Sequence, residues 1–156
     1  MTNTEPGKSL DIVYSAADAT DVARKYDDWA TRYDSEMSSL GYRHPTICLA
    51  LLARHLPPGD GSVLDAGAGT GLLGEWMRIV GYDRCEALDI SEKMLEVARQ
   101  KQVYDALHVA QLGETLPLHD ATFAGVVVAG VFTVGHVGPE GFDELIRVTR
   151  PGGVLV

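Results

Sequence analysis

From residue 61 onward the chain alternates short apolar segments with stretches of helical periodicity, and this rhythm restricts the fold to very few classes. The strands expected from the apolar segments span residues 62–66, 85–90, 106–110, 125–130 and 154–156. The helices expected in the same region span residues 72–80, 91–101 and 140–148. Strands that alternate with helices are joined by right-handed crossovers, which give a mostly parallel sheet covered on both faces. We therefore predict a doubly wound α/β core.

The residues before this core form a separate helical region in the prediction. Residues 1–17 are expected to be a flexible N-terminus, and residues 18–60 a helical cap. Helical periodicity covers residues 18–38, and a second apolar helix begins at Pro45 and ends where prolines follow Leu56. The cap and the core, residues 61–156, together make the expected domain organisation.

Composition excludes several classes of partner. The chain has 156 residues, enough for one domain, and 13 basic against 22 acidic side chains give a net charge of −9. Nucleic-acid binding needs clustered basic side chains, and the sequence has no such cluster. No apolar run reaches the roughly 18 residues of a membrane helix, and a signal-peptide pattern is absent. Two cysteines at no metal-ligand or redox spacing indicate buried thiols, so we expect a cytoplasmic protein without a metal.

The segment VLDAGAGTGLLG follows the first predicted strand and opens the next helix. Its glycines fit two ligand patterns. Gly69, Gly71 and Gly74 spell G-x-G-x-x-G, the dinucleotide fingerprint. Asp65 followed by the glycines of GAGTG spells a different pattern, an acid before G-x-G-x-G. Glycines let the backbone approach a ligand closely, and the helix that follows offers free N–H groups to a pyrophosphate or a carboxylate.

Asp65 favours the second pattern. A carboxylate is unfavourable beside a doubly charged pyrophosphate, but it suits an ammonium. S-adenosylmethionine carries an ammonium, a carboxylate and a sulfonium, and no phosphate. The alternative role of Asp65 is structural, as an acceptor of hydrogen bonds from the loop. Helix–strand packing then explains Gly74 better than a phosphate does.

Asp89 ends the second predicted strand, and it lies about 20 residues beyond the glycine loop, where an acid accepts hydrogen bonds from ribose hydroxyls. Both candidate cofactors contain a ribose, so Asp89 indicates an adenosine cofactor without choosing between them. Its alternative role is only to cap the following helix, although Ser91 is better placed for that.

In these motifs the chain resembles class I S-adenosylmethionine-dependent methyltransferases. The resemblance rests on VLDAGAGTG (63–71), ALDISEKMLEVAR (87–99), the LP turn (116–117), FAGVVVAGV (123–131) and RVTRPGGVLV (147–156). The segments YDDWATRYDSEMSSLGYRHP and GVFTVGHV are more narrowly similar to the small methyltransferases related to the Williams–Beuren syndrome chromosome-region protein. The resemblance implies a Rossmann-like sheet of five strands in the order 3-2-1-4-5, with N-terminal helices added.

The resemblance also implies where S-adenosylmethionine would bind. Asp65 and the backbone from Gly67 to Gly71 would hold the methionine moiety, and Asp89 would hold the ribose. The other residues expected around the cofactor are Ala66, Gly69, Ile90, Met94, Gln111, Leu112 and Gly130. Gln111 stands near the place where the family often has an acid close to the adenine amino group, and a glutamine carbonyl accepts the same hydrogen bond.

Two further features have two interpretations each. Tyr26, Trp29 and Tyr33 recur at helical spacing, which is typical of core packing. In resembling enzymes an N-terminal aromatic segment folds over the cofactor as a lid, and Tyr33 would then contact the methionine end. His136 lies in a glycine-flanked loop at the expected crevice, where it would act as a base or a substrate ligand, or only as a hydrogen-bonding residue of the loop.

The expected activity is transfer of a methyl group by in-line displacement to an atom of a small-molecule acceptor, leaving S-adenosylhomocysteine. Such chemistry depends on placing the nucleophile, and proximity and orientation contribute roughly 7–11 kcal/mol to it. Two alternatives stay open: a protein that binds S-adenosylmethionine without turnover, and an NAD-dependent oxidoreductase, which Asp65 opposes.

Enzymes of this class continue past the fifth strand with a helix and two more strands. The chain is therefore expected to be a C-terminally truncated form that lacks the last two strands of the usual fold. An uncovered sheet edge is a site of association, so a homodimer through that edge is expected.

Overall fold

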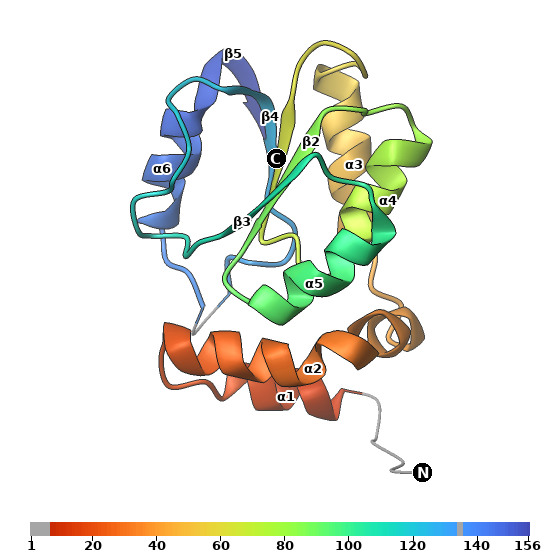
Figure 1. Cartoon of the computed structure of the whole chain (residues 1–156), viewed down its shortest axis with the longest axis vertical. Coiled ribbons are helices and arrows are strands. Elements are labelled where there is room, and N and C mark those ends of the chain that lie inside the picture. Colours follow the sequence, from red (N-terminus) through yellow and green to blue (C-terminus); the bar gives the residue numbers. More distant parts are fainter. Residues whose placement is uncertain (1–6, 134–135) are drawn as a thin grey trace.

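The computed structural model describes residues 7–133 and 136–156. Its centre is a five-stranded sheet in the order β3-β2-β1-β4-β5, and every neighbouring pair is parallel (Figure 1). The strands are β1 (Val63–Ala66), β2 (Cys85–Asp89), β3 (Ala106–Val109), β4 (Phe123–Val127) and β5 (Thr149–Leu155). The helices are α1 (Lys8–Tyr14), α2 (Ala19–Ser39), α3 (His44–His55), α4 (Leu72–Ile79), α5 (Glu92–Lys101) and α6 (Gly141–Val148). The predicted Rossmann-like fold and its strand order are confirmed.

Helices cover both faces of the sheet (Figure 1). On one face, Leu52 of α3 and Met77 of α4 pack with residues of β1, β2 and β4 in a fully buried cluster. On the other face, Leu145 of α6 packs with Leu64 and Val126. Full burial of one such side chain contributes roughly 1.5–3 kcal/mol, so these two clusters hold the helices on the sheet.

A third apolar cluster belongs to the N-terminal region alone. Val13, Trp29 and Met37 form its buried centre, and Tyr26 and Tyr33 pack against it. Val13 and its neighbours explain why residues 8–14 form helix α1 within the segment that the sequence analysis assigned to a flexible N-terminus. Residues 1–6 lie outside the described residues.

Helix starts follow local chemistry. The Ser91 hydroxyl accepts a hydrogen bond from the Met94 amide and caps α5, as its sequence predicts. Asp18 caps α2 in the same way through the Asp21 amide. Helix α4 begins instead after Gly71, whose φ of 84° is left-handed, so the glycine loop turns directly into the helix.

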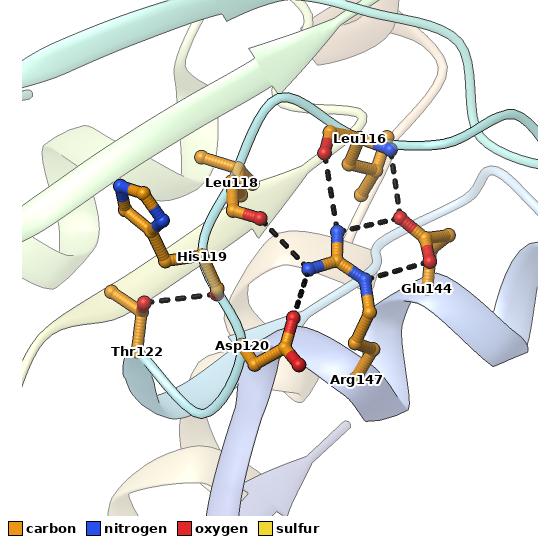
Figure 2. Close-up of polar contacts among 7 residues, drawn as sticks. All are labelled: Leu116, Leu118, His119, Asp120, Thr122, Glu144 and Arg147. Carbon is orange, nitrogen blue, oxygen red and sulfur yellow. Dashed lines mark hydrogen bonds and ion pairs between the residues drawn. The ribbon is translucent and has the colours of Figure 1, made fainter.

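The connection from β3 to β4 contains no helix and is held on α6 by Arg147. Figure 2 shows its guanidinium donating to the carbonyl oxygens of Leu116 (3.1 Å) and Leu118 (2.8 Å) and to the carboxylates of Glu144 and Asp120. Glu144 in turn accepts from the Leu116 amide at 2.7 Å. This network fixes the segment that begins at the carboxyl end of β3.

Strand β5 begins earlier than predicted. The last strand was expected at residues 154–156, but it starts at Thr149 and includes Pro151, Gly152 and Gly153, which are residue types typical of a turn. The pairing with β4 shifts register between Phe123 and Gly125, so the extra residues of β5 are taken up in an irregular stretch.

Candidate functional site

A pocket lies where the segments after β1, β2, β3 and β4 meet beneath α2. The space between its lining atoms is about 770 Å³, part of it open to solvent. The carboxyl ends of parallel strands are where ligands bind in open α/β sheets. The lining residues from the core are Gly67, Gly69, Leu88, Asp89, Ile90, Met94, Ala110, Gln111, Leu112, Ala129, Gly130, Val131, His136 and Val137, and those from α2 are Ala19, Val22, Tyr26 and Tyr33.

The glycine loop reaches the pocket through two of its glycines. Gly67 has a φ of 78° and Gly69 a φ of 54°, both in the left-handed region that favours glycine. A Cβ on Gly67 would collide with Val131, so this backbone lies directly against the segment after β4. A Cβ on Gly69 would meet nothing within 4 Å, because Gly69 faces the open pocket.

Asp89 links the glycine loop to the end of β2. Its carboxylate accepts hydrogen bonds from the amides of Gly69 (2.8 Å) and Ser91 (2.9 Å). Burial raises the pKa of this carboxyl, and the backbone donors oppose the rise. A carboxylate has about four acceptor positions, so Asp89 retains capacity for a ligand hydroxyl. The N-cap of α5 is Ser91 and not Asp89, so capping of this helix does not account for Asp89.

Asp65 is 1% exposed and does not line the pocket. Its carboxylate accepts a hydrogen bond of 2.5 Å from the Tyr104 hydroxyl, and that hydroxyl accepts from the Gly74 amide at 3.1 Å. Burial raises the pKa of Asp65 to about 7, while the hydrogen bond from Tyr104 opposes the rise. Asp65 therefore makes a structural contact, but with the Tyr104 hydroxyl and not with the loop amides that the sequence suggested. Ala66 is fully buried and does not line the pocket either.

Tyr104, which contacts the glycine segment from outside the pocket, was not predicted, because a single tyrosine before β3 belongs to no motif. The pocket-lining residues Val22, Leu88 and Val137 were not predicted either. Tyr104 also explains Gly74. A Cβ at Gly74 would overlap the Tyr104 ring, so Gly74 admits this ring into the packing between α4 and the sheet. Packing, and not a phosphate, accounts for the third glycine of the dinucleotide pattern.

The aromatic stripe of α2 divides between the core and the pocket. Trp29 is buried, and its ring packs edge-on against Tyr33 with centroids 4.7 Å apart. Tyr26 and Tyr33 line the pocket. Their burial raises the pKa of both phenols, so both remain protonated near neutral pH.

His136 stands opposite Tyr26, and the structure brings it to the pocket as expected. Its Nε2 lies 3.4 Å from the Tyr26 hydroxyl, and the Tyr14 ring meets it edge-on at 5.4 Å between centroids. His136 and Val137 also line a second, shallower hollow with Phe132 and Phe142, whose rings stack 4.2 Å apart. His136 is thus shared between the main pocket and this outer hollow.

Within residues 7–133 and 136–156, no group of three or more His, Cys, Asp or Glu side chains could hold a metal ion. None of the helices in this part of the chain is both long enough and apolar enough to span a membrane.

Comparison with known proteins identifies the family of this chain. Residues 64–156 match the model of a methyltransferase domain, which is more than half of the chain. Human methyltransferase-like protein 27 is 36% identical over 161 residues, which covers 97% of this chain and 65% of the relative. A demethylmenaquinone methyltransferase from Beutenbergia cavernae is 37% identical and covers 89% of this chain and 58% of the relative. The chain thus spans less than two thirds of the length of these curated relatives.

Solved structures agree on the fold. A TehB-like S-adenosylmethionine-dependent methyltransferase from Corynebacterium glutamicum aligns with a TM-score of 0.63 at 20% identity, covering 85% of this chain and 72% of that protein. The [4+2]-cyclase SpnF aligns with a TM-score of 0.69, also at 20% identity, covering 90% of this chain and 59% of that protein. The family assignment rests on the domain match and the human relative. The chain therefore belongs to the methyltransferase domain family, in the class I, S-adenosylmethionine-dependent group that its motifs predict.

Proposed function

We propose that the pocket binds S-adenosylmethionine and that the protein transfers its methyl group to a small-molecule acceptor. The observation that carries this proposal is the convergence of Gly67, Gly69 and Asp89 on one pocket at the strand ends. Gly67 and Gly69 belong to one motif and Asp89 to another, and both motifs lie within the residues that match the family. The Gly69 amide donates a hydrogen bond to the Asp89 carboxylate.

The chemistry of the lining fits a cofactor that has a ribose and lacks phosphate. Among the described residues that line the pocket, Asp89 is the acid and none is lysine or arginine. The carboxylate of Asp89 suits the ribose hydroxyls of either candidate cofactor, whereas the described lining, without lysine or arginine, leaves a pyrophosphate with no cationic side chain beside it. Apolar residues such as Ile90, Met94 and Leu112 offer a surface for a purine ring. S-adenosylmethionine meets these conditions better than NAD does.

The residues then divide the cofactor between them. Asp89 would hold the ribose, Gln111 and Leu112 the adenine, and the backbone at Gly67 and Gly130 the methionine end. When bound, S-adenosylmethionine supplies a methyl group on a positively charged sulfur. Tyr33 would cover the methionine end from α2, in line with its position on the pocket wall.

His136 is the residue that we propose to position the acceptor or to take its proton. It lies between the main pocket and the outer hollow, so an acceptor seated in the hollow would present its nucleophile past the imidazole. A small acceptor agrees with the net charge of −9, which disfavours polyanionic substrates. The name of the Beutenbergia cavernae relative likewise indicates a quinone-type acceptor for that protein.

Calorimetry with S-adenosylmethionine, S-adenosylhomocysteine and NAD tests the cofactor. We expect both sulfur compounds to bind and NAD not to bind; tight binding of NAD alone would refute the proposal. Asp89→Ala should weaken binding of both sulfur compounds strongly. Asp83→Ala, at an exposed position two residues before β2, is the matched control and should leave binding unchanged.

Binding without turnover is the second candidate. It stays open because a shared fold does not by itself require methyl transfer, as the likeness to a cyclase illustrates. Incubation with a radiolabelled methyl donor and a panel of small phenols, amines and quinols separates the two. Transfer of label to any acceptor, lost in His136→Ala with cofactor affinity retained, supports the enzyme and the role of His136.

A further inference from the structure

The dipeptide Tyr-Asp occurs twice on α2, at residues 26–27 and 33–34, seven residues apart. Seven residues make nearly two helical turns, so the two copies lie on the same side of the helix. Tyr26 and Tyr33 both line the cofactor pocket. Each is followed by an aspartate that contacts the core, which gives the repeat a structural meaning.

Asp27 contacts the start of α5. The Ser91 hydroxyl donates to Asp27 Oδ1 at 2.6 Å, and the Lys93 amide donates to the same oxygen at 3.2 Å. Ser91 is fully buried and lies two residues after Asp89. A carboxylate at a helix N-terminus also interacts favourably with the helix dipole. Asp27 therefore fastens α2 beside the ribose side of the pocket.

Asp34 contacts the glycine loop itself. The hydroxyl of Thr70, which is 1% exposed, donates to Asp34 Oδ1. Lys101 Nζ lies 2.6 Å from the other oxygen of Asp34 and 2.8 Å from Glu75 Oε2 of α4. Asp34 therefore fastens α2 beside the methionine side of the pocket, through a hydroxyl and an ammonium.

The N-terminal helices pack as a unit of their own. Their apolar cluster around Trp29 is separate from the two clusters on the sheet faces. In Figure 1, α1 and α2 lie together across one end of the sheet. The chain leaves α2 through Gly41, whose φ of 69° is left-handed and whose Cβ position is open, as suits a hinge.

The lid that the family resemblance implies corresponds to α1 and α2. We propose that Asp27 and Asp34 are positioning residues, which clasp this lid to Ser91 and Thr70 and thereby hold Tyr26 and Tyr33 over the cofactor. The identity of the ligand in this inference rests on the proposed function. The clasps lie on the two loops that hold the cofactor, so cofactor release requires both clasps to open. Their loss should therefore speed dissociation more than it changes association.

The dissociation rate of tritiated S-adenosylmethionine, chased with excess unlabelled compound, tests the clasps. In Asp27→Ala/Asp34→Ala we expect dissociation at least about tenfold faster, because a hydrogen bond to a charged group stabilises by more than one factor of ten. The association rate, obtained from this rate and Kd, should change by less than about threefold. A merely structural defect would lower the association rate as well.

Asp28→Ala is the matched control, since Asp28 lies on the same helix, is exposed, and pairs only with Arg24 at 3.6 Å among the described residues. Its dissociation rate should equal that of the unaltered protein. A dissociation rate within twofold of the unaltered protein in the double variant would overturn the inference.

Hydrogen exchange without cofactor separates this inference from the proposed function. In the double variant the amides of α2 should exchange faster, while those of β1 and β2 should not change. Unchanged protection of α2 would overturn the clasps even if S-adenosylmethionine binds. Absence of S-adenosylmethionine binding to the unaltered protein would instead refute the proposed cofactor, while faster exchange would still support the clasps.

Discussion

Replacing Tyr104 by phenylalanine removes one hydroxyl and with it two hydrogen bonds, one donated to Asp65 and one accepted from Gly74. The ring remains to fill the space beside Gly74. The substitution therefore isolates the polar link between the acid of the glycine motif and the first turn of α4. Asp65 is almost completely buried, so solvent screens this link very little.

The cost of Tyr104→Phe depends on pH. Burial raises the pKa of Asp65 from 3.8 to about 7, so between these values the folded state binds a proton that the unfolded state has released. The free energy of unfolding therefore falls as pH rises from about 4 to 7. The Tyr104 hydrogen bond opposes the raised pKa, and its loss raises the pKa further. The extra destabilisation in the variant thus appears when pH rises through 7.

The magnitude follows from the charge of the acceptor. At pH 5 the Asp65 carboxyl is protonated, and losing a neutral hydrogen bond costs about 1 kcal/mol. At pH 9 the carboxylate is ionised in the unaltered protein, and losing a hydrogen bond to a charged group costs roughly 1.5–3 kcal/mol. Urea unfolding followed by circular dichroism at the two pH values measures the difference.

Tyr82→Phe is the matched control. The buried Tyr82 hydroxyl donates to the Leu56 carbonyl at 2.5 Å, so the acceptor is neutral at every pH. Its loss should cost about 1 kcal/mol at both pH 5 and pH 9. If Tyr104→Phe likewise has equal cost at the two pH values, the coupling between Tyr104 and the ionisation of Asp65 is refuted.

Three further outcomes are expected. Gly74→Ala should destabilise the fold by about 1–3 kcal/mol in thermal unfolding, because its Cβ overlaps a ring; helix propensity alone predicts the opposite sign, so stabilisation would contradict the packing. Arg147→Met should speed hydrogen exchange in the β3–β4 segment, and equal exchange would show that its hydrogen bonds to that segment do not hold it. A thiol reagent should modify half-buried Cys48 in the native protein but not Cys85, whose pKa burial raises to about 12; two equivalents without denaturant would contradict this.

The fold could be predicted because its signals are local. Each strand of the parallel sheet is a short apolar run, and the handedness of the crossovers then leaves few strand orders. The predicted start of β5 is wrong because Pro151, Gly152 and Gly153 are residue types typical of a turn. The pairing that draws them into β5 depends on the register with β4, and a register shift has no local sequence signal.

The site could be predicted where it consists of motifs and not where it consists of contacts distant in sequence. Gly69 and Asp89, which the motifs assign to one cofactor site, both line the pocket and are joined by a hydrogen bond. Tyr104 contacts Asp65 across 39 residues, and Asp27 contacts Ser91 across 64 residues. No motif links either pair of residues, because whether two residues so far apart in sequence meet depends on how the helices and strands between them pack.

The aromatic stripe shows why the two interpretations of α2 were incomplete. Core packing and covering of the pocket are not alternatives on this helix. Trp29 packs in the core, while Tyr26 and Tyr33 line the pocket. A helix has 3.6 residues per turn, so positions seven apart share a side, and a position between them can face elsewhere. The repeat of seven residues was therefore the more informative pattern, and it includes the aspartates as well as the tyrosines.

The glycine loop is held from three directions. Asp89 accepts from the Gly69 amide, Asp34 accepts from the Thr70 hydroxyl, and the Tyr104 hydroxyl accepts from the Gly74 amide. Gly67, Gly69 and Gly71 adopt left-handed backbone, but glycines also raise the entropy that the chain loses on becoming ordered. Asp89 and Tyr104 hold this segment independently of the lid, so binding need not supply that part of the ordering free energy. Asp65 belongs to the same arrangement, because its carboxylate accepts a hydrogen bond from the Tyr104 hydroxyl, which in turn accepts from Gly74 in the first turn of α4.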